Sequence, residues 1–476
     1  MTTSYDRVAY PALVFLHTHP ERLAVMAALA GLHPVPPDEA RVLDIGGGDC
    51  VNLMAIAAAY PGCDAHGFDL SEAAIGRGQT LARAAGFANV TLAVEDIMAA
   101  HRRYPARSCD YIIAHGVYAW VPPAVREALM AFIGHALSER GVAFVSYNCM
   151  PGGHVRLILR EMLLDALDGI DDPAERVAAA RAFLESYAAP RAGEDALFVA
   201  VREQAASMLE RPDALLFHDE LGDAYHPQRF LDVVRHAEAN GLRFLTDSGR
   251  NRLLDGFLTE DPPEGVGAAD FDALDAAVLR TATLDDYQAM RFFRHTLFVR
   301  AEQRPDRLID PDRFARLLVT TRMQRQADGS FQHKGASVTL ADPQLADALE
   351  RVAAQHPLRQ PVSAVATNPQ QLMALLMLFS QGDVTLHVGP TPFPLKPGAY
   401  PQSSPLVRAM IADGAEKLCT LENMFMRIDH EPTRALLMAA DGTRTLAEVA
   451  AAGHGIPPDE VEAALTAAAV RGLMAG

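Results

Sequence analysis

The stretch Val42-Leu43-Asp44-Ile45-Gly46-Gly47-Gly48-Asp49-Cys50 decides how this chain folds. Arg41–Ile45 is predicted as a short buried strand, and Asn52–Tyr60 after the glycines is predicted as a helix. Glycine tolerates a positive φ and lets the backbone approach a ligand closely. The following helix offers N–H groups without intrahelical partners in its first turn. The pattern therefore predicts a strand–turn–helix unit that holds a ligand.

Two ligand classes use such a turn. Dinucleotide-binding folds require G-x-G-x-x-G, and Val51 occupies the third glycine position here. Methyltransferases that bind S-adenosylmethionine place an acidic residue at the strand end before G-x-G. Asp44, Gly46 and Gly48 fit this second pattern. The motif therefore favours S-adenosylmethionine over a nicotinamide dinucleotide.

Acidic residues also follow the next two predicted strands, Asp64–Phe68 and Val90–Val94. Asp69 lies 25 residues after Asp44 and can accept hydrogen bonds from ribose hydroxyls. Asp96 can accept from the adenine amino group, and Ile97 can pack on the ring. A glycine turn with surface acids is the alternative interpretation. The predicted cofactor-binding set is Asp44, Gly46, Gly48, Asn52, Asp69, Leu70, Asp96, Ile97 and His115.

The first 150 residues alternate between strand and helix patterns, which predicts parallel strands joined by right-handed crossovers. The predicted elements are helices at Pro20–Leu32, Glu72–Ala85 and Pro123–Ser138, and strands at Tyr111–His115 and Val142–Tyr147. Residues 155–215 are helical by pattern. A helix at Pro227–Asn240 and strands at Leu242–Thr246 and Arg294–Arg300 then resume the alternation. We expect an α/β domain whose sheet is completed after a helical insertion.

Beyond residue 304 the sequence no longer alternates regularly between strand and helix patterns. Asp328-Gly329 predicts a hairpin turn, and Val384–Val388 predicts a strand. Residues 390–406 contain six prolines and are interpreted as a linker. The tail from Pro405 onward is predicted to be helical.

Composition excludes several classes of protein. Hydrophobic residues make up 50% of the 476, and the formal charge is −18, which argues against broad nucleic-acid binding. The odd number of cysteines, five without a CxxC pair, fits a reducing cytoplasm and no disulfide framework. We predict no signal peptide, no membrane-spanning helix and no metal site.

The chain resembles the class I methyltransferases that carry a methyltransferase regulatory domain, which include bacterial protein-lysine methyltransferases. The most specific stretches are His115-Gly116-Val117-Tyr118-Ala119-Trp120-Val121-Pro122 and Ser146-Tyr147-Asn148 with Pro151-Gly152. Thr18-His19-Pro20, His218-Asp219-Glu220-Leu221 and Asp441-Gly442-Thr443-Arg444 also fit. The resemblance implies a Rossmann-like cofactor-binding core (1–154), a helical insertion for homodimerisation (155–215), completion of the core and regulatory domain (216–303), a middle α+β domain (304–398) and a C-terminal α+β winged-helix-like domain (399–476).

The sequence departs from that family at four positions. Cys50 replaces a glycine of the first motif, and His17 replaces a common glutamine. The family usually has an aromatic residue at Met150 and a tryptophan at Gly153. An aromatic face attracts an ammonium group by about 0.5–2 kcal/mol. These two losses weaken the argument for a lysine acceptor.

The acceptor is expected at the carboxyl ends of the strands, where ligands of parallel sheets bind. The predicted catalytic residues are His115, Tyr118, Tyr147 and His154, and a purely structural role remains the alternative for each histidine. Tyr5, Tyr10, His17 and His19 form an N-terminal segment expected to cover the site. Trp120 is interpreted as a core anchor rather than a substrate platform.

Three functions remain open from the sequence. The first is S-adenosylmethionine-dependent methylation of a peptide or protein side chain, with S-adenosylhomocysteine as product and lysine nitrogen as the acceptor that the resemblance suggests. The second is C-, N- or O-methylation of a ribosomal peptide natural product or small molecule. The third is a scaffold without enzymatic activity.

Overall fold

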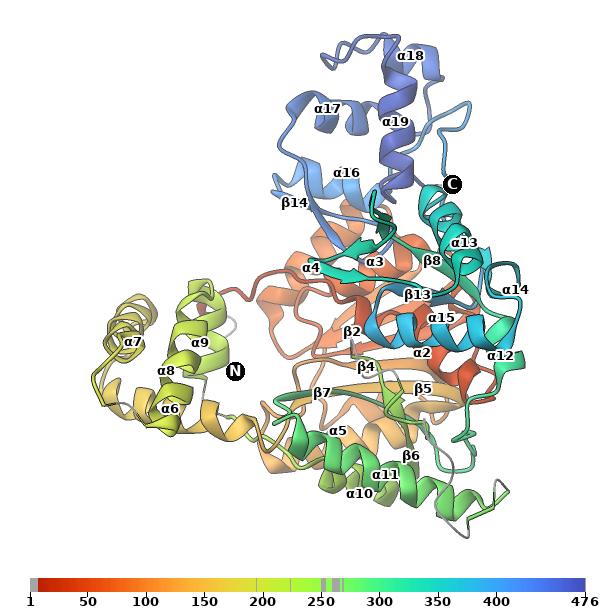
Figure 1. The fold of residues 1–476 in the computed structure, drawn as a ribbon. Helices are drawn as coiled ribbons and strands as arrows, with labels where there is room; N and C mark the ends of the chain where they lie inside the picture. The colour runs from red at the N-terminus through yellow and green to blue at the C-terminus, as the bar shows by residue number, and fades with distance from the viewer. Residues whose placement is uncertain are drawn as a thin grey trace.

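In the computed structural model a central sheet carries three further units (Figure 1). The structure describes residues 7–193, 195–222, 224–249, 254–258, 266–267 and 269–475. The sheet has seven strands in the order β3-β2-β1-β4-β5-β7-β6. Its strands are β1 (Arg41–Ile45), β2 (Asp64–Asp69), β3 (Val90–Val94), β4 (Cys109–Ala114), β5 (Leu137–Asn148), β6 (Leu242–Asp247) and β7 (Phe293–Arg300).

The first five strands pair in parallel, as the alternation predicted. β7 runs antiparallel to both β5 and β6. The sheet is therefore completed after the helical insertion, which confirms the prediction from the sequence. The α/β fold with a Rossmann-like core is confirmed as well.

Helices cover both faces of this sheet. The helices are α2 (Pro20–Leu29), α3 (Val51–Ala59), α4 (Glu72–Ala84), α5 (Pro123–Ala136), α10 (Phe230–Ala239) and α11 (Phe271–Gln288). One hydrophobic core joins α2 and α3 to the middle domain, and a second joins the other face of the sheet to α5, α10 and α11. The middle domain therefore packs on the central sheet and its helices through a shared core.

The middle domain contains two small sheets. It consists of α12 (Pro311–Ala315), β8 (Leu318–Thr321), β9 (Gln324–Arg325), β10 (Phe331–His333), β11 (Ala336–Val338), α13 (Pro343–Ala354), β12 (Gln360–Pro361), α14 (Val362–Val365), α15 (Pro369–Gln381) and β13 (Val384–His387). Gly329 has a φ of 84° between β9 and β10. The hairpin predicted at Asp328-Gly329 is confirmed.

Two outer units have cores of their own. The helical insertion, on the left in Figure 1, contains α6 (Gly153–Ala166), α7 (Pro173–Ala188), α8 (Ala196–Leu209) and α9 (Asp213–Leu221). The C-terminal unit, at the top, contains α16 (Pro405–Ala412), β14 (Lys417–Cys419), β15 (Phe425–Arg427), α17 (Glu431–Ala439), α18 (Leu446–Ala450) and α19 (Val461–Val470). Its core includes Val51, Met54 and Ala82, so it packs directly on α3 and α4.

Three predictions of local structure were wrong. The helix expected from Pro227 begins at Phe230, and β5 begins at Leu137, inside the predicted helix end. The purely helical tail contains the β14–β15 hairpin. Its turn has no glycine, because Asn423 adopts the left-handed conformation at φ 56°. Asparagine tolerates that region better than most residues, so the usual turn signal is absent from the sequence.

Candidate active site

The glycine turn after β1 contains two glycines in the left-handed conformation. Gly46 has a φ of 67° and Gly48 a φ of 60°. A Cβ atom at Gly46 would lie 2.7 Å from Val117 Cγ2, whereas a Cβ at Gly48 would meet nothing within 4 Å. A side chain at position 48 would therefore fill open space beside the turn. This space is where a ligand can approach the backbone.

Asp69 joins the turn to the end of the second strand. Its Oδ2 accepts a hydrogen bond of 2.9 Å from Gly48 N, and its Oδ1 accepts one of 2.9 Å from Ser71 N. Glu95 N donates to Asp69 O at 3.0 Å, which holds the end of the third strand alongside. The carboxylate thus lies between the glycine turn and α4.

Asp44 is buried below the same turn. A Cβ at Gly47 would lie 2.9 Å from Asp44 Oδ2, so glycine is required there by the close carboxylate. Burial, and next the negative charge of Asp69, raise the pKa of Asp44 to about 7, while the hydrogen bond from Asn52 opposes the shift. The ion pairs of the described residues do not include Asp44. A ligand that brings a positive charge would offset this burial.

Cys50 begins α3 in a left-handed conformation at φ 58°. Glycine is the usual residue for this conformation, since a Cβ there costs about 1–2 kcal/mol. The Cys50 side chain is buried, and its Sγ would lie 2.7 Å from a Cβ at Gly67. The departure from the glycine pattern is therefore accommodated by a second glycine on β2.

The other predicted cofactor-binding residues line the same edge. Leu70 is 54% exposed directly after β2. Asp96 is exposed and its Oδ1 accepts from Met98 N at 2.9 Å, while Ile97 is partly buried against the core. The ends of the three strands thus carry carboxylates and apolar side chains along one edge of the sheet.

Asn52 connects this edge to two distant segments. Its Oδ1 accepts from Phe15 N at 2.9 Å, and its Nδ2 donates to Thr18 Oγ1 at 3.1 Å. Asn423 of the C-terminal hairpin donates from Nδ2 to Asn52 Oδ1 at 3.2 Å and to Phe15 O at 3.1 Å. The C-terminal domain therefore reaches the cofactor-binding edge. Sequence reasoning missed Asn423, because nothing in the sequence relates two positions so far apart.

His115 lies at the end of β4 in a cluster of rings. Its Nδ1 shares a hydrogen bond of 2.8 Å with Ser146 Oγ. Its ring centroid is 4.0 Å from Phe15, 5.1 Å from His17 and 6.2 Å from His295. Burial, and then His295, lower the pKa of His115 to about 3, so the ring is neutral. The N-terminal segment thus covers the end of β4 through Phe15 and His17, and His295 is an addition that sequence reasoning missed.

The remaining predicted catalytic residues are not brought together with His115. Tyr118 bonds His236 Nδ1 at 2.7 Å, and Tyr147 bonds Thr296 Oγ1 at 3.0 Å. Both tyrosines are fully buried in the core, and burial raises the pKa of each hydroxyl. Tyr147 follows Ser146 on β5, and successive strand residues face opposite sides of a sheet. His154 is exposed on the first turn of α6.

Trp120 packs on a cation from the chain itself. The Arg156 guanidinium lies 5.0 Å from the Trp120 ring centroid, 5.1 Å from Tyr225 and 5.7 Å from Phe292. Arg156 also pairs with buried Glu220 at 2.7 Å. This aromatic set therefore fixes the helical insertion to the core, and the anchoring role predicted for Trp120 fits the contacts.

The N-terminal segment divides between two neighbours. Phe15 and His17 cover His115, whereas Tyr10 packs on His218 of α9 at 5.5 Å. Tyr5 lies outside the described residues. Within the described part of the chain, no three or more His, Cys, Asp and Glu side chains are grouped to hold a metal ion, and no helix has the length and apolarity to cross a bilayer.

Comparison with known proteins agrees with this geometry. Residues 42–141 match the family described as methyltransferase domain, and residues 212–300 match the predicted methyltransferase regulatory domain. RP028 of Rickettsia prowazekii is 30% identical over 249 residues, which cover 51% of this chain and 96% of RP028. RP789 of the same organism is 28% identical over 314 residues, 65% of this chain and 54% of RP789.

Solved structures share the whole fold. PKMT2 from Rickettsia typhi matches with a TM-score of 0.80 at 21% identity, covering 98% of this chain and 100% of PKMT2. Its complex with AdoHcy (S-adenosylhomocysteine) matches with a TM-score of 0.77 and the same identity and coverage. The strand-end geometry and these matches define an S-adenosylmethionine-dependent methyltransferase. Within that class, the chain belongs to the methyltransferases that carry a methyltransferase regulatory domain.

Proposed function

We propose that this enzyme methylates a side chain of a peptide or protein, with the lysine ε-amino group as the first acceptor to test. The observation that carries the proposal is the neutral, ring-lined end of β4 at His115, beside the open edge of the sheet. The resemblance to PKMT2, whose name points to a protein-lysine methyltransferase, extends over the middle and C-terminal domains and supports the same acceptor class.

The donor residues have distinct proposed roles. Asp69 would hold the ribose, Asp96 and Ile97 the adenine, and Asp44 with the glycine turn the charged amino-acid tail. When bound, S-adenosylmethionine supplies an electrophilic methyl group on a positively charged sulfur. The buried carboxylate of Asp44 fits a ligand of this charge, because it has no cationic partner within the described chain.

His115 is proposed to orient the acceptor. A neutral imidazole can accept a hydrogen bond from an amine, and Ser146 Oγ fixes the ring through Nδ1. Methyl transfer needs the acceptor lone pair aligned at about 3–3.5 Å and water excluded. Phe15 and His17 provide the cover over this end of the strand. The proton of the alkylated amine then leaves to solvent.

The direct test compares matched peptides. Purified enzyme and S-adenosylmethionine are incubated with a lysine-containing peptide and with its arginine-substituted counterpart, and products are read by mass spectrometry. We expect one or more added methyl groups on the lysine peptide alone. His115→Ala should lower kcat strongly on that peptide. Methylation of neither peptide, together with activity on an acceptor without amines, would contradict the lysine assignment.

The alternative acceptor is a ribosomal peptide natural product or a small molecule, methylated at carbon, nitrogen or oxygen. The structure bears on the departure that suggests it. A Cβ at Gly153 would lie 2.8 Å from Pro227 Cβ, so a tryptophan does not fit at this position without rearrangement. Met150 is only partly buried and accepts a larger side chain more readily. Met150→Phe is therefore the informative variant, and a raised kcat/KM on lysine peptides would favour the first function.

The helical insertion is the proposed homodimer contact. Leu197 on α8 is 60% exposed and Ile158 on α6 is 38% exposed, although this unit has a buried core of its own. Analytical ultracentrifugation of wild type and Leu197→Asp tests this contact. We expect the variant to shift toward monomer.

A further inference from the structure

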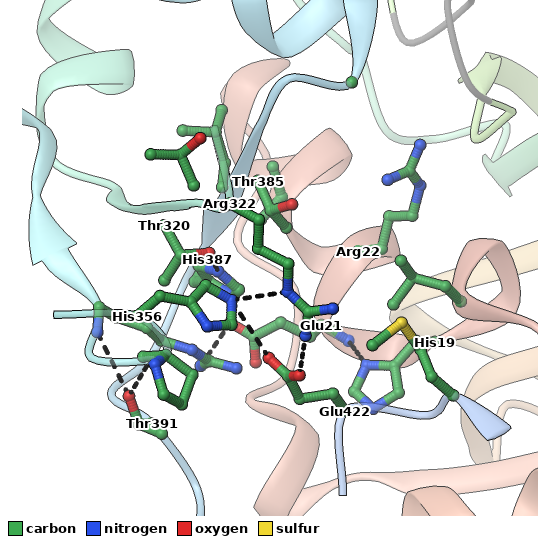
Figure 2. Close-up of a pocket in the computed structure, with 18 of the residues that line it drawn as sticks. His19, Glu21, Arg22, Thr320, Arg322, His356, Thr385, His387, Thr391 and Glu422 are labelled. Atoms are coloured by element: carbon green, nitrogen blue, oxygen red, sulfur yellow. Dashed lines mark hydrogen bonds and ion pairs between the residues drawn. The ribbon is translucent and has the colours of Figure 1, made fainter. Parts of the chain in front are cut away.

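A cavity of about 160 Å³ lies apart from the cofactor-binding edge (Figure 2). It is bounded by the start of α2, by β8 and β13 of the middle domain, and by the turn between β14 and β15. The residues predicted to bind the cofactor do not line it. A single water needs about 10–15 Å³ of such space, so the cavity has room for an organic molecule.

His19 lines this cavity and carries a ring nitrogen that is unpartnered in the described chain. Its Nδ1 accepts from Glu21 N at 3.3 Å as the cap of α2. Burial, and then Arg359, lower the pKa of His19 to about 3, so the ring is neutral. Because Nδ1 accepts, the single ring proton lies on Nε2. That Nε2 is buried and has no hydrogen-bond partner among the described residues.

Two further histidines present ring nitrogens from the middle domain. His356 Nε2 accepts from Arg322 Nε at 3.0 Å, and burial lowers the pKa of His356 to about 4, which leaves its proton on Nδ1. His387 shares a hydrogen bond of 2.9 Å with Thr320 Oγ1 through Nε2. Its Nδ1 is buried and, within the part of the chain described, has no partner.

The acidic groups around the cavity are already occupied. Glu21 accepts from Val388 N at 2.7 Å, from Tyr60 Oη at 2.6 Å and from Arg359 Nη1 at 3.2 Å. Asp383 pairs with His333 at 3.0 Å, and Glu422 pairs with Arg322. The three carboxylates of the lining are therefore already engaged by other donors of the chain. Its cationic lining residues, Arg22, Arg322, Lys334 and Arg359, outnumber its three acids by one.

We propose that this cavity binds a small organic acid, with its carboxylate on His19 and His387 and an apolar body against Leu16, Val25 and Phe379. A carboxylate supplies only acceptors, which is what His19 Nε2 requires, and it fits His387 when Thr320 Oγ1 donates to Nε2 and the proton lies on Nδ1. Buried polar groups are nearly always hydrogen-bonded, so a pair without partners beside a cavity marks a ligand's place. The apolar part of the lining favours an organic acid over inorganic phosphate.

A ligand in this cavity would lie next to the N-terminal segment that covers the end of β4. Leu16 and His19 line the cavity, while Phe15 and His17 of the same segment face His115. Thr18 between them holds Asn52 at the cofactor-binding edge. A bound acid would therefore contact the segment that covers the acceptor end of β4.

The test uses benzoate as probe and benzamide as its uncharged counterpart of the same shape. Full-length enzyme is first saturated with S-adenosylhomocysteine, so that binding at the cofactor edge is excluded. Thermal unfolding is then followed as each probe is added. We expect benzoate to raise Tm with a saturable dose dependence, because a ligand that binds only the folded state stabilises it, and benzamide to have no effect.

Substitutions of the cavity histidines test where benzoate binds. His19→Asn keeps a good helix cap but removes the Nε2 donor, and it should weaken benzoate binding at least tenfold. His387→Asn should do the same, while His101→Asn on an exposed turn should bind as wild type does. Equal effects of benzoate and benzamide would overturn the proposal, as would unchanged binding in His19→Asn. Binding of a peptide with a free C-terminal carboxylate but not of benzoate would assign the cavity to the acceptor instead.

Discussion

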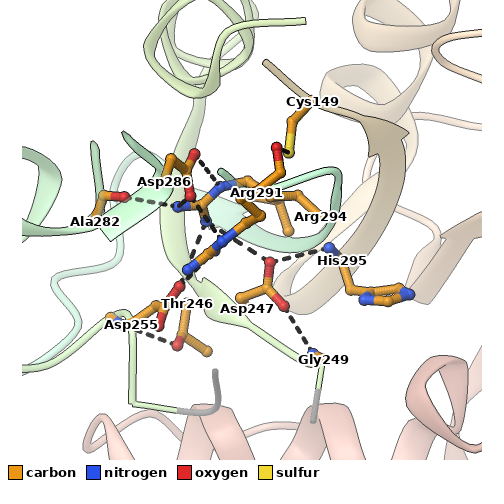
Figure 3. A network of polar contacts seen from close by, with 12 residues as sticks. Cys149, Thr246, Asp247, Gly249, Asp255, Ala282, Asp286, Arg291, Arg294 and His295 are labelled. Atoms are coloured by element: carbon orange, nitrogen blue, oxygen red, sulfur yellow. Dashed lines mark hydrogen bonds and ion pairs between the residues drawn. The ribbon is translucent and has the colours of Figure 1, made fainter. Parts of the chain in front are cut away.

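Two regions of this molecule bury carboxylates, and they differ in the charged groups that lie next to those carboxylates. Around β7, Arg294 pairs with Asp286 at 2.8 Å, and Arg291 pairs with Asp255 at 2.7 Å (Figure 3). At the carboxyl end of β1, Asp44 is also buried, and its neighbours are the amide of Asn52 and the carboxylates of Asp69 and Asp49. The first region contains guanidiniums that pair with its carboxylates, whereas no ion pair among the described residues includes Asp44.

The difference separates structural charge from binding charge. A buried carboxylate that pairs with a guanidinium is partly compensated within the chain, and the pair fixes the elements that supply it. Arg294 also donates to Ala282 O, so it joins α11 to the end of the sheet. A buried carboxylate without a cation carries a free-energy penalty that a cationic ligand can remove. We therefore predict that Asp44 binds the cofactor, whereas the network around Arg294 joins structural elements.

The sharpest way to break this comparison is Arg294→Ala. It leaves Asp286 and Asp247 without the guanidinium, and removing one partner of a buried pair costs about 3–5 kcal/mol. Urea unfolding of the full chain measures the loss. Arg427→Ala, which breaks an exposed pair with Asp429, should lower the free energy of unfolding far less. Similar losses of unfolding free energy in the two variants would show that the buried ion pairs stabilise the fold no more than an exposed pair does.

Asp44→Asn should weaken cofactor binding but raise the stability of the chain without cofactor. The amide keeps the shape and the contact with Asn52 but removes the charge. We expect the affinity for S-adenosylmethionine to fall by more than tenfold in calorimetry. Without cofactor at pH 8, the variant should be more stable by about 1–3 kcal/mol, because an unpaired buried carboxylate is gone. A variant that loses both stability and affinity would show that Asp44 is structural.

Asp69→Ala offers a companion measurement at the exposed side of the same site. Its carboxylate joins Gly48 N to Ser71 N, and its loss should weaken S-adenosylmethionine binding by more than tenfold. Stability without cofactor should change less than in Arg294→Ala, since Asp69 is only partly buried whereas Arg294 is fully buried. Unchanged affinity would remove Asp69 from the site.

The pH dependence of S-adenosylmethionine binding also tests the role of the buried Asp44 carboxylate. The pKa of Asp44 is about 7 in the folded chain, against an ordinary value of 3.8. The folded state therefore holds a proton here between about pH 4 and 7, and the stability this proton contributes is lost as the pH rises through 7. A cationic ligand favours the ionised form, so affinity should rise with pH up to about 7 and then level. Calorimetry at pH 6 should detect proton release, which Asp44→Asn should abolish.

Much of this site could be predicted because its parts are local in sequence. The strand, the glycine turn and the acid at a strand end are each decided within a few residues, and β1, β2 and β3 are neighbours along the chain. Asp44, Gly48 and Asp69 were therefore predicted from their spacing, and their contacts with the cofactor stay a prediction. Tyr118 and Tyr147 were chosen by the same rule but face the core, because a strand end does not specify on which side a side chain lies.

What could not be predicted depends on contacts between distant segments. Ser146 holds His115 from the neighbouring strand, and His295 comes from an antiparallel strand that returns after the helical insertion. The unpartnered nitrogens of His19 and His387 become meaningful only when the middle domain packs on α2. Such sites arise from packing, and no local pattern encodes them.

The smallest expected effect concerns the C-terminal domain. Asn423 donates to Asn52 and to Phe15 O from the β14–β15 turn, so Asn423→Ala should loosen both without removing a charge. A neutral hydrogen bond contributes about 0.5–1.5 kcal/mol, which predicts a three- to tenfold weaker affinity for S-adenosylmethionine. Arg427→Ala on the same hairpin is the matched control and should bind normally. Equal affinities for both variants would mean that the C-terminal domain packs on the core without shaping the cofactor site.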